Sequence, residues 1–459
     1  MPSESANTFR RITSQHASSN RATSNRATSN RATSNRATVL IDGNNFYASC
    51  EAVVDPSVLN RPLVVLSNND GCIVSRSAEA RALGIPMGTP YFKVRRDLER
   101  HNVVVRSSNY ALYADMSQRL MATLEPWVEE LEIYSIDEAF GQLQRPLGGG
   151  DLTHWAREVR QCVLRQLGLP VAVGVAPSKV LAKLANKLAK ATPSCGGVFD
   201  LGAVANPDPH LEAVAIEEVW GIGRQLSRWC RLRGIANAKA LRDMNSGELK
   251  RKCGVVGLRL QQELRGVACI PLERVPPAKR ETCVSRSFSQ PITDRLALSQ
   301  AIATYLSRGA EKLRRQRQRA GAITVFVRSN PFNGTSFYSR AATVTLAVAS
   351  SDTAVLLAAA LPLAQQLFRA HKPLHKAGIL LQQLVDEHTL QHHLLLPLPL
   401  DEQRRRQTLM TTIDRLNRRY GQGTVQWAAC GLNPAWRMRR ARLSRAATTR
   451  LSDIPTVQA

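Results

Sequence analysis

Residues 38–42 read Thr-Val-Leu-Ile-Asp, and residues 131–138 read Leu-Glu-Ile-Tyr-Ser-Ile-Asp-Glu, so two short apolar runs each end in carboxylates. The first run is typical of a buried strand, and the second of a strand followed by a tight turn. Strands and helical stretches alternate around both runs, which predicts an α/β or α+β core. Two strands of one sheet could then bring Asp42, Asp137 and Glu138 together.

Three carboxylates at one sheet edge are suited to binding divalent cations. Carboxylate oxygens are ligands that Mg²⁺ prefers, and two ions about 4 Å apart would activate a hydroxyl and neutralise the leaving group of a phosphoryl transfer. Each part alone has an ordinary interpretation as well. Residues 42–45 (Asp-Gly-Asn-Asn) also suit a turn, and adjacent Asp-Glu pairs usually face solvent. Spacing alone leaves both interpretations open.

The charge balance indicates a polyanionic partner. The 459 residues include 62 Lys+Arg and 36 Asp+Glu, a formal net charge of +26, and phosphate neutralisation makes nucleic acid the first candidate. The surplus is concentrated in residues 279–345 and 401–459, away from the acidic core. The nine cysteines form no CxxC pair, and no apolar run approaches about 20 residues. A zinc ribbon, a disulfide framework and a membrane-spanning helix are therefore excluded, and reduced thiols in a cytoplasm are expected.

The N-terminus is of low complexity. The unit Arg-Ala-Thr-Ser-Asn occurs three times in residues 21–35 and breaks off at residues 36–38. A five-residue polar unit has no apolar face to bury, which predicts a disordered extension over residues 1–37. We expect the original start near Val39, with a tandem DNA repeat translated upstream of it.

Several regions follow this extension. Residues 62–74 predict a hairpin, because the Asn-Asp-Gly of its turn tolerates positive φ, and a short helix follows over 78–83. The segments beyond the core are a helical region (206–270), a linker (271–281), a βαββαβ region in the order of a ferredoxin-like domain (282–386), a second linker (387–402) and a basic C-terminal region (403–459).

Basic and glycine-rich motifs suit phosphate groups. Arg81 and Lys190 could hold a triphosphate, although the lysine stripe that ends at Lys190 is more often a solvated helix face. Glycines let the backbone N–H groups at a helix start approach a phosphate closely. Two such motifs in the helical region favour sequence-independent DNA backbone binding over ordinary helix turns, through Gly221, Gly223, Arg224, Gly254 and Gly257.

These motifs resemble those of a known family. Residues 42–51 (DGNNFYASCE) resemble the first catalytic motif of the Y-family DNA polymerases, and residues 135–140 (SIDEAF) resemble the second. Residues 66–72 (LSNNDGC) and 113–117 (YADMS) narrow the resemblance to the UmuC branch of that family. The resemblance runs from about residue 38 to the C-terminus.

The resemblance implies a right-handed polymerase, with a palm at 38–46 and 113–205, fingers at 47–112, a helix-hairpin-helix thumb at 206–270 and a ferredoxin-like little finger at 282–386. It also implies a DNA-directed nucleotidyltransferase, an error-prone enzyme of translesion synthesis in the SOS response to DNA damage. In that reaction the primer 3′-hydroxyl attacks the α-phosphate of a dNTP and releases pyrophosphate.

The resemblance further assigns roles to individual residues. Asp42, Asp137 and Glu138 would bind two Mg²⁺ ions, with the Gly43 carbonyl as an additional ligand. Tyr47 would exclude the ribonucleotide 2′-hydroxyl, although a core aromatic would pack in the same place. The triphosphate contacts would be the Asn45 and Phe46 amides with Ser75, Arg81 and Lys190, and the template roof would be Cys72 and Val74. The sequence departs from the pattern at Ala78, where many relatives carry a phosphate-binding Tyr.

Primed and damaged DNA and dNTPs would be the substrates of such an enzyme. Residues 391–396 (QHHLLL) resemble a degraded sliding-clamp-binding peptide, although a plain apolar linker accounts for them equally well. The basic tail at 437–445 resembles the end of UmuC proteins, which implies a UmuD′ dimer or a RecA filament as partner. Two alternatives stay open: a polymerase-like palm used for cyclic nucleotide synthesis or nuclease action, and a non-catalytic DNA-binding or SOS-regulatory subunit.

Overall fold

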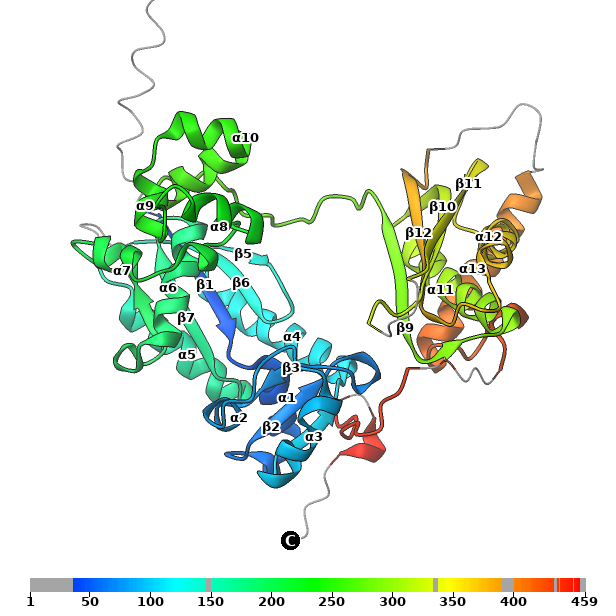
Figure 1. The fold of residues 1–459 in the computed structure, drawn as a ribbon, viewed down its shortest axis with the longest axis horizontal. Helices are drawn as coiled ribbons and strands as arrows, with labels where there is room; N and C mark the ends of the chain where they lie inside the picture. The colour runs from blue at the N-terminus through cyan, green and yellow to red at the C-terminus, as the bar shows by residue number, and fades with distance from the viewer. Residues whose placement is uncertain are drawn as a thin grey trace, which may run out of the picture.

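The computed structural model describes residues 36–145, 150–332, 337–389, 400–432, 436, 438–448 and 450–454. Three sheets and one helical region organise these residues (Figure 1). We refer to them as the five-stranded, three-stranded, helical and four-stranded modules. The repeats of residues 21–35 and the clamp-binding peptide predicted at 391–396 lie outside the described residues.

The five-stranded module has the strand order β5-β6-β1-β7-β8. Its central strand β1 is buried along most of its length and pairs antiparallel with β6 and β7. The strands are β1 (Arg36–Gly43), β5 (Glu130–Ile133), β6 (Glu138–Gln144), β7 (Val171–Ala176) and β8 (Val198–Asp200). One face packs against α1 (Phe46–Val54), α4 (Tyr110–Leu124) and α5 (Thr153–Leu167), and the other against α6 (Lys179–Ala191). The predicted mixed α and β core is confirmed.

The first strand begins earlier than predicted. β1 starts at Arg36, and Ala37 is fully buried opposite Leu143 of β6. The incomplete repeat at residues 36–38 is followed by Val39, where a complete unit would continue with Ser-Asn. Its Ala and Thr therefore adjoin the apolar run and become strand residues. The predicted extension over residues 1–37 is therefore wrong at its last two residues, which belong to the sheet.

The three-stranded module contains the predicted hairpin. Its strands β2 (Leu63–Leu66), β3 (Ile73–Arg76) and β4 (Val104–Ser107) have the order β3-β2-β4, which leaves β4 at an edge. The turn between β2 and β3 has positive φ at Asn69 (63°) and Asp70 (51°), as the Asn-Asp-Gly pattern requires. The helices of this module are α2 (Ala78–Ala82) and α3 (Tyr91–Arg100).

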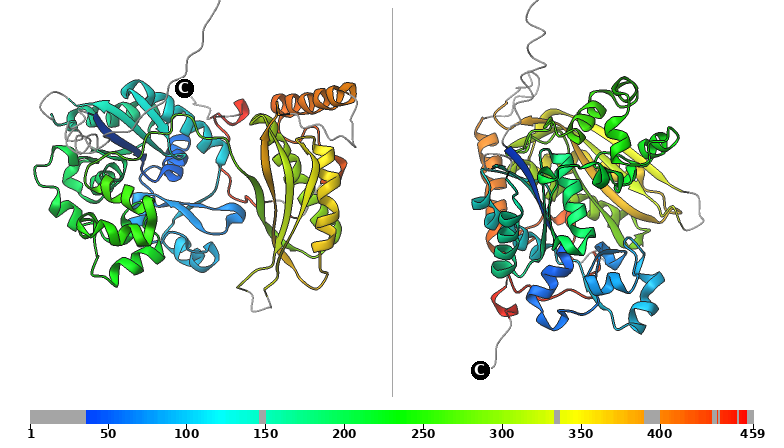
Figure 2. Two further views of the ribbon diagram at one scale, coloured as in Figure 1. Left: turned by 90° about the horizontal axis from the view of Figure 1, so that it is seen from above. Right: turned by 90° about the vertical axis from the view of Figure 1, so that its left-hand side faces the viewer.

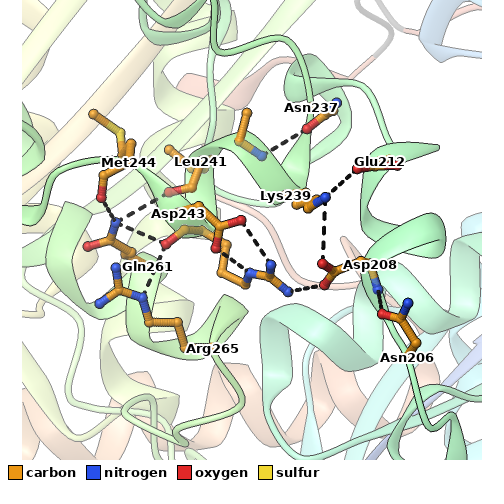
Figure 3. A network of polar contacts seen from close by, with 12 residues as sticks. Asn206, Asp208, Glu212, Asn237, Lys239, Leu241, Asp243, Met244, Gln261 and Arg265 are labelled. Carbon is orange, nitrogen blue, oxygen red and sulfur yellow. Dashed lines mark hydrogen bonds and ion pairs between the residues drawn. The ribbon is translucent and has the colours of Figure 1, made fainter.

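The helical module shares a hydrophobic core with α6. Its helices are α7 (Asp208–Glu212), α8 (Arg224–Arg231), α9 (Ala238–Asp243) and α10 (Ser246–Leu264). A polar network joins α7, α9 and α10 (Figure 3): the buried Gln261 amide donates to the carbonyl oxygens of Met244 at 2.7 Å and Arg242 at 3.2 Å, and Arg242 pairs with Asp208 at 2.6 Å. Satisfying a buried amide in this way fixes α9 against α10.

The four-stranded module has the predicted βαββαβ element order. The elements are β9 (Thr282–Ile292), α11 (Arg295–Arg315), β10 (Gln318–Arg328), β11 (Ser339–Ser350), α12 (Thr353–Leu367) and β12 (Leu374–Asp386). The sheet order is β11-β10-β12-β9, so the last strand lies between β9 and β10; in the ferredoxin-like order the third strand fills that gap. Both helices cover one face, while the other face turns toward the rest of the chain (Figure 2). α13 (Leu400–Tyr420) begins within the predicted second linker.

A buried ion pair anchors the start of the predicted first linker, which has no helix or strand between Leu264 and Thr282. Lys179 of α6 pairs with Glu132 of β5, and both residues are at most 6% exposed. Lys179 Nζ also donates to the Pro271 carbonyl at 2.8 Å, and Glu132 accepts from the Glu273 N–H at 2.7 Å. The pair thus joins the sheet to the linker.

Replacing Lys179 with Met is expected to destabilise the five-stranded module by about 3–5 kcal/mol, because the buried Glu132 carboxylate loses its partner. Urea unfolding followed by circular dichroism would measure the loss. Arg95→Met is the matched control, because it removes an exposed pair with Glu99 and should move the midpoint little. Equal midpoints for both variants would contradict the assigned role of Lys179.

None of the helices in the described ranges combines the length and apolarity that crossing a bilayer requires.

Candidate active site

Strand register brings the three predicted carboxylates to one edge of the five-stranded sheet. Asp42 at the end of β1 is the register partner of Glu138 at the start of β6, and opposed residues project side chains to the same face. Asp137 directly precedes β6, and its carbonyl oxygen accepts a hydrogen bond from the Gly43 N–H at 2.8 Å. The predicted convergence of these positions is therefore present in the backbone.

Each of the three carboxylates has a different partner. Asp42 Oδ1 lies 2.5 Å from Lys190 Nζ, and Glu138 Oε2 lies 3.2 Å from Lys183 Nζ. Asp137 Oδ1 accepts a hydrogen bond from Ser135 Oγ at 2.7 Å. In the described ranges, no three His, Cys, Asp or Glu side chains form a ready group of metal ligands. The carboxylates therefore share an edge of the sheet without forming a closed set of ligands.

The electrostatics of Asp42 fit a cation at this edge. Burial raises the pKa of Asp42 to about 7, the ammonium of Lys190 opposes the rise, and the nearby Glu138 carboxylate adds to it. A carboxylate that another carboxylate destabilises gains from any added positive charge. The three carboxylates and the Gly43 carbonyl oxygen are all hard oxygen donors, the kind that Mg²⁺ prefers. The residues present therefore fit a divalent cation.

A cavity of about 860 Å³ adjoins the acidic edge. It lies between the five-stranded and three-stranded modules, and the first turn of α1 forms part of its wall. Its lining includes most of the predicted site residues, namely Asp42, Gly43, Asn45, Phe46, Tyr47, Val74, Ser75, Arg81, Asp137 and Lys190, and also Ala78, where the sequence departs from the family pattern. Residues more than 140 positions apart in the sequence thus share one cavity.

Hydrogen bonds fix the phosphate-binding candidates around Asn45. Asn45 has a φ of 50° and precedes α1, and Arg81 Nη2 donates to its Oδ1 at 2.7 Å. Ser75 Oγ donates to the Asn45 carbonyl oxygen at 3.2 Å and accepts from the Ala48 N–H at the same distance. A helix N-terminus beside a guanidinium and an ammonium favours an anion, so this wall is suited to phosphate.

Tyr47 lies in a cluster of three tyrosines at the cavity wall. Its ring stacks on Tyr113 with centroids 4.4 Å apart and planes at 15°, and Tyr110 meets it edge-on at 6.2 Å. The Tyr113 hydroxyl donates to the buried Glu51 carboxylate at 2.6 Å. Stacked rings hold one another in a fixed plane, so Tyr47 presents a rigid face to the cavity.

Replacing Glu51 with Gln is expected to change how stability depends on pH. Burial raises the pKa of Glu51, opposed by hydrogen bonds from Tyr113 and Ser444. With a raised folded pKa, the stability from this carboxyl is present at low pH and is lost as pH rises through that pKa. Gln keeps the oxygen that accepts from Tyr113 but carries no proton to lose.

The Glu51→Gln variant should therefore gain stability over the wild type as pH rises from about 4 to about 8. Urea unfolding across this series would measure the difference. Parallel pH profiles for the two proteins would show that burial of Glu51 has no such effect.

The lysine stripe of α6 is solvated only toward its C-terminal end: Lys179 is buried, whereas Lys190 is exposed. All four lysines pair with carboxylates: Lys179 with Glu132, Lys183 with Glu138, Lys187 with Glu218 and Lys190 with Asp42. The Lys183 ammonium also lies 4.4 Å from the centre of the Tyr134 ring, within cation–π range. The acids come from distant strands and helices, so helical spacing alone could not reveal them.

The two predicted roof residues differ in position. Val74 lines the cavity, whereas Cys72 is not part of its lining.

Arg160 lines the cavity but was not predicted, because it lies on α5 with no local motif. Its guanidinium donates to the carbonyl oxygens of Val171 at 2.6 Å and Gly196 at 2.5 Å. Arg160 thus joins α5 to the start of β7 at Val171 and to the loop at Gly196.

The glycine motifs lie in the helical module, outside the lining of the cavity. Gly221 and Gly254 have φ of 91° and 63°, which favour glycine, and Gly254 breaks α10 into two helical parts. Gly223 precedes α8, whose first residue is Arg224, and Gly257 is buried after the break. Leu260, three residues after Gly257, packs beside Gly221. Val255 and Val256 at the break are 58% and 77% exposed.

Known proteins are similar to this chain in sequence and in fold. The impB/mucB/samB family matches residues 41–187, and its C-terminal domain matches residues 279–394. A domain of unknown function (DUF4113) matches residues 407–457.

Individual relatives agree with these matches. The chain is 41% identical to Protein UmuC of Salmonella typhimurium over 91% of this chain and 99% of that protein. It is 27% identical to DNA polymerase IV of Bacillus velezensis over 85% of this chain and 92% of that protein.

Among solved structures, a Y-family DNA polymerase chimera of Dbh and Dpo4 is similar, with a TM-score of 0.60 and 22% identity, over 76% of this chain and 99% of that one. The predicted resemblance is confirmed: the chain belongs to the impB/mucB/samB family and has the fold of a Y-family DNA polymerase.

Proposed function

We propose that this chain is an error-prone, template-directed DNA polymerase that performs translesion synthesis in the SOS response to DNA damage. The observation that carries the proposal is one cavity lined by both acidic and phosphate-binding groups. Asp42 and Asp137 line it together with Arg81, Lys190 and the first residues of α1. Carboxylates beside phosphate-binding groups suit nucleotidyl transfer. The family membership and the named relatives support the same activity.

We assign the predicted polymerase domains to the modules. The five-stranded module would be the palm (38–46 and 113–205), and the three-stranded module the fingers (47–112). The helical module would be the thumb (206–270), and the four-stranded module the little finger (282–386). α1 contributes to the core of the five-stranded module, so in this assignment it joins palm to fingers.

Asp42, Asp137, Glu138 and the Gly43 carbonyl would hold two Mg²⁺ ions. When bound, the ions would supply charge neutralisation at the phosphates and activation of the primer 3′-hydroxyl. Arg81 and the first N–H groups of α1 orient the triphosphate against the cavity wall. Lys190 is 2.5 Å from Asp42 and reaches the phosphates once Asp42 has another partner. Positioning by these groups supplies much of the rate enhancement.

DNA would contact two surfaces, one glycine-rich and one basic. The two glycine motifs of the thumb offer backbone N–H groups to phosphates. The open face of the little finger sheet turns toward the other modules, in the part of the chain where positive charge is concentrated. We further propose a cytoplasmic, nucleoid-associated enzyme that works with a UmuD′ dimer, a RecA filament and the sliding clamp.

Primer extension on a template with an abasic site tests this function. The full chain, with accessory partners supplied, should add nucleotides opposite and beyond the site only when Mg²⁺ is present. Binding of primed DNA without any nucleotide addition would favour the non-catalytic DNA-binding alternative. Turnover of nucleotides without a template would favour the small-molecule alternative.

A further inference from the structure

The C-terminal region matched by the domain of unknown function contacts both the four-stranded and the three-stranded module. Its first part packs on the four-stranded module, where Asp414 of α13 accepts two hydrogen bonds from Arg314 at 2.7 Å each. Cys430 and Trp436 belong to the hydrophobic core of that module. Residues 438–445, which we call the strap, then reach the three-stranded module (Figure 1, red).

The strap binds at the free edge of the three-stranded sheet. β4 is an edge strand, and edge strands present unpaired backbone groups that another segment can bind. The Ser107 N–H donates to the Arg442 carbonyl oxygen at 2.9 Å, and the Arg442 N–H donates to Ser107 Oγ at 3.0 Å. The strap therefore covers the end of β4.

Two side chains in the turn between β2 and β3, those of Asn69 and Asp70, bind the strap. Asp70 Oδ1 accepts from Ser107 Oγ at 2.6 Å, and its Oδ2 accepts from the Ala441 N–H at 3.0 Å. Asn69 Oδ1 accepts from the Arg439 N–H at 3.0 Å, while its Nδ2 donates to the Ser287 carbonyl oxygen of β9 at 2.8 Å. The strap, the edge strand and the four-stranded module all meet at this turn.

The same contacts reach the supports of the proposed nucleotide pocket. Asn109 Nδ2 donates to Ser444 Oγ at 3.0 Å, and Asn109 Oδ1 caps α4 by accepting from the Leu112 N–H. α4 carries Tyr113, which stacks on Tyr47. On the other side, the turn leads into β3, whose Val74 and Ser75 line the cavity. The strap thus contacts both elements that shape this pocket.

We propose that the strap is a built-in positioning element: whereas linker 271–281 joins the little finger to the thumb, the strap holds the little finger to the fingers beside the Asn69–Ser287 hydrogen bond, and Asp70 is the residue that seats it. This assigns a role to the family domain of unknown function. The positioning effect rests on the proposed polymerase function, whereas seating of the strap does not. Because the strap binds Asp70 and Asn69 through the backbone N–H groups of Ala441 and Arg439, its sequence can vary while its binding is kept.

Partial trypsin digestion of the full chain tests whether the strap is seated. Trypsin cleaves after the strap arginines at 439, 440, 442 and 445, and mass spectrometry gives the cleavage rate. Asp70→Ala should accelerate cleavage about tenfold or more, because it removes a charged acceptor. Ala441→Pro removes one donor from the strap itself and should likewise accelerate cleavage after the arginines at 442 and 445; the bond after Arg440 then precedes a proline, resists trypsin and is left out of the comparison. Asp97→Ala, a matched loss of charge on α3, should cleave at the wild-type rate. Equal rates in all four proteins would overturn the proposal.

Single-nucleotide insertion tests the positioning effect. Asp70→Ala should raise the KM for dNTP about fivefold and change kcat less than twofold, because it loosens the pocket without touching reacting groups. A lower kcat with unchanged KM indicates a merely structural role and would overturn the positioning claim. Should Asp70→Ala fail to fold, as judged by circular dichroism, Ala441→Pro decides both tests. If wild-type protein protects the strap but adds no nucleotide, the proposed function fails while the strap assignment stands.

Discussion

Asp137→Asn is expected to reduce Mg²⁺-dependent primer extension by about 10³-fold or more, because it removes a charged oxygen ligand from the proposed metal site. The substitution is close to isosteric, and the new amide oxygen can still accept the hydrogen bond that Ser135 Oγ donates to Asp137. The acidic edge should therefore keep its shape while losing charge. The rate of single-nucleotide insertion on primed DNA is the measurement.

Two comparisons separate this effect from a loss of folding or of DNA affinity. Asp97→Asn removes the same charge from an exposed site on α3, where Asp97 pairs only loosely with Arg100 at 3.8 Å, and should insert nucleotides at the wild-type rate. DNA binding by Asp137→Asn, measured in the absence of nucleotide, should match the wild type. Wild-type extension rates in Asp137→Asn would remove the acidic edge from the mechanism.

The sequence predicted the backbone of this site well because the relevant signals are local. Apolar runs that end in acids predicted β1, which carries Asp42, and β5, which is followed by the turn that holds Asp137, although the strand that begins at Glu138 was not predicted. Asn-Asp-Gly predicted the turn with positive φ at Asn69 and Asp70. The period of the hydrophobic pattern, the residue types of a turn and the alternation of strands with helices can all be read from residues close together in the sequence. For the same reason the helical region and the βαββαβ order were predicted correctly.

What the sequence could not predict depends on partners distant in the chain. The α6 lysines pair with acids on β1, β5, β6 and residue 218, and helical spacing carries no record of those acids. Arg160 lines the cavity through backbone carbonyls, which have no sequence signature. The docking of strap residue Arg442 on Ser107 is likewise made between backbone groups far apart. The order of strands in a sheet, such as the place of β12 between β9 and β10, is also set by pairing between strands far apart in the sequence.

Tyr47→Ala is expected to lower discrimination against ribonucleotides by about 10²-fold, because the ring occupies the space that a 2′-hydroxyl would need. The ring lines the cavity and is held flat against Tyr113 at 4.4 Å, so it cannot easily move aside for a larger sugar. The ratio of kcat/KM for a dNTP to that for the matching rNTP is the measurement. Insertion of the dNTP itself should change far less than this ratio.

Tyr47→Phe is the matched control, because it keeps the ring and the stack on Tyr113 while removing only the hydroxyl. It should retain the wild-type discrimination. If Tyr47 is instead only a core aromatic, Tyr47→Ala would lower the unfolding midpoint and leave the sugar preference unchanged. The two roles thus differ in readout: a gate changes a ratio between substrates, whereas packing changes the fraction of folded enzyme and scales both rates equally. Unchanged discrimination in a folded Tyr47→Ala protein would therefore exclude the gate.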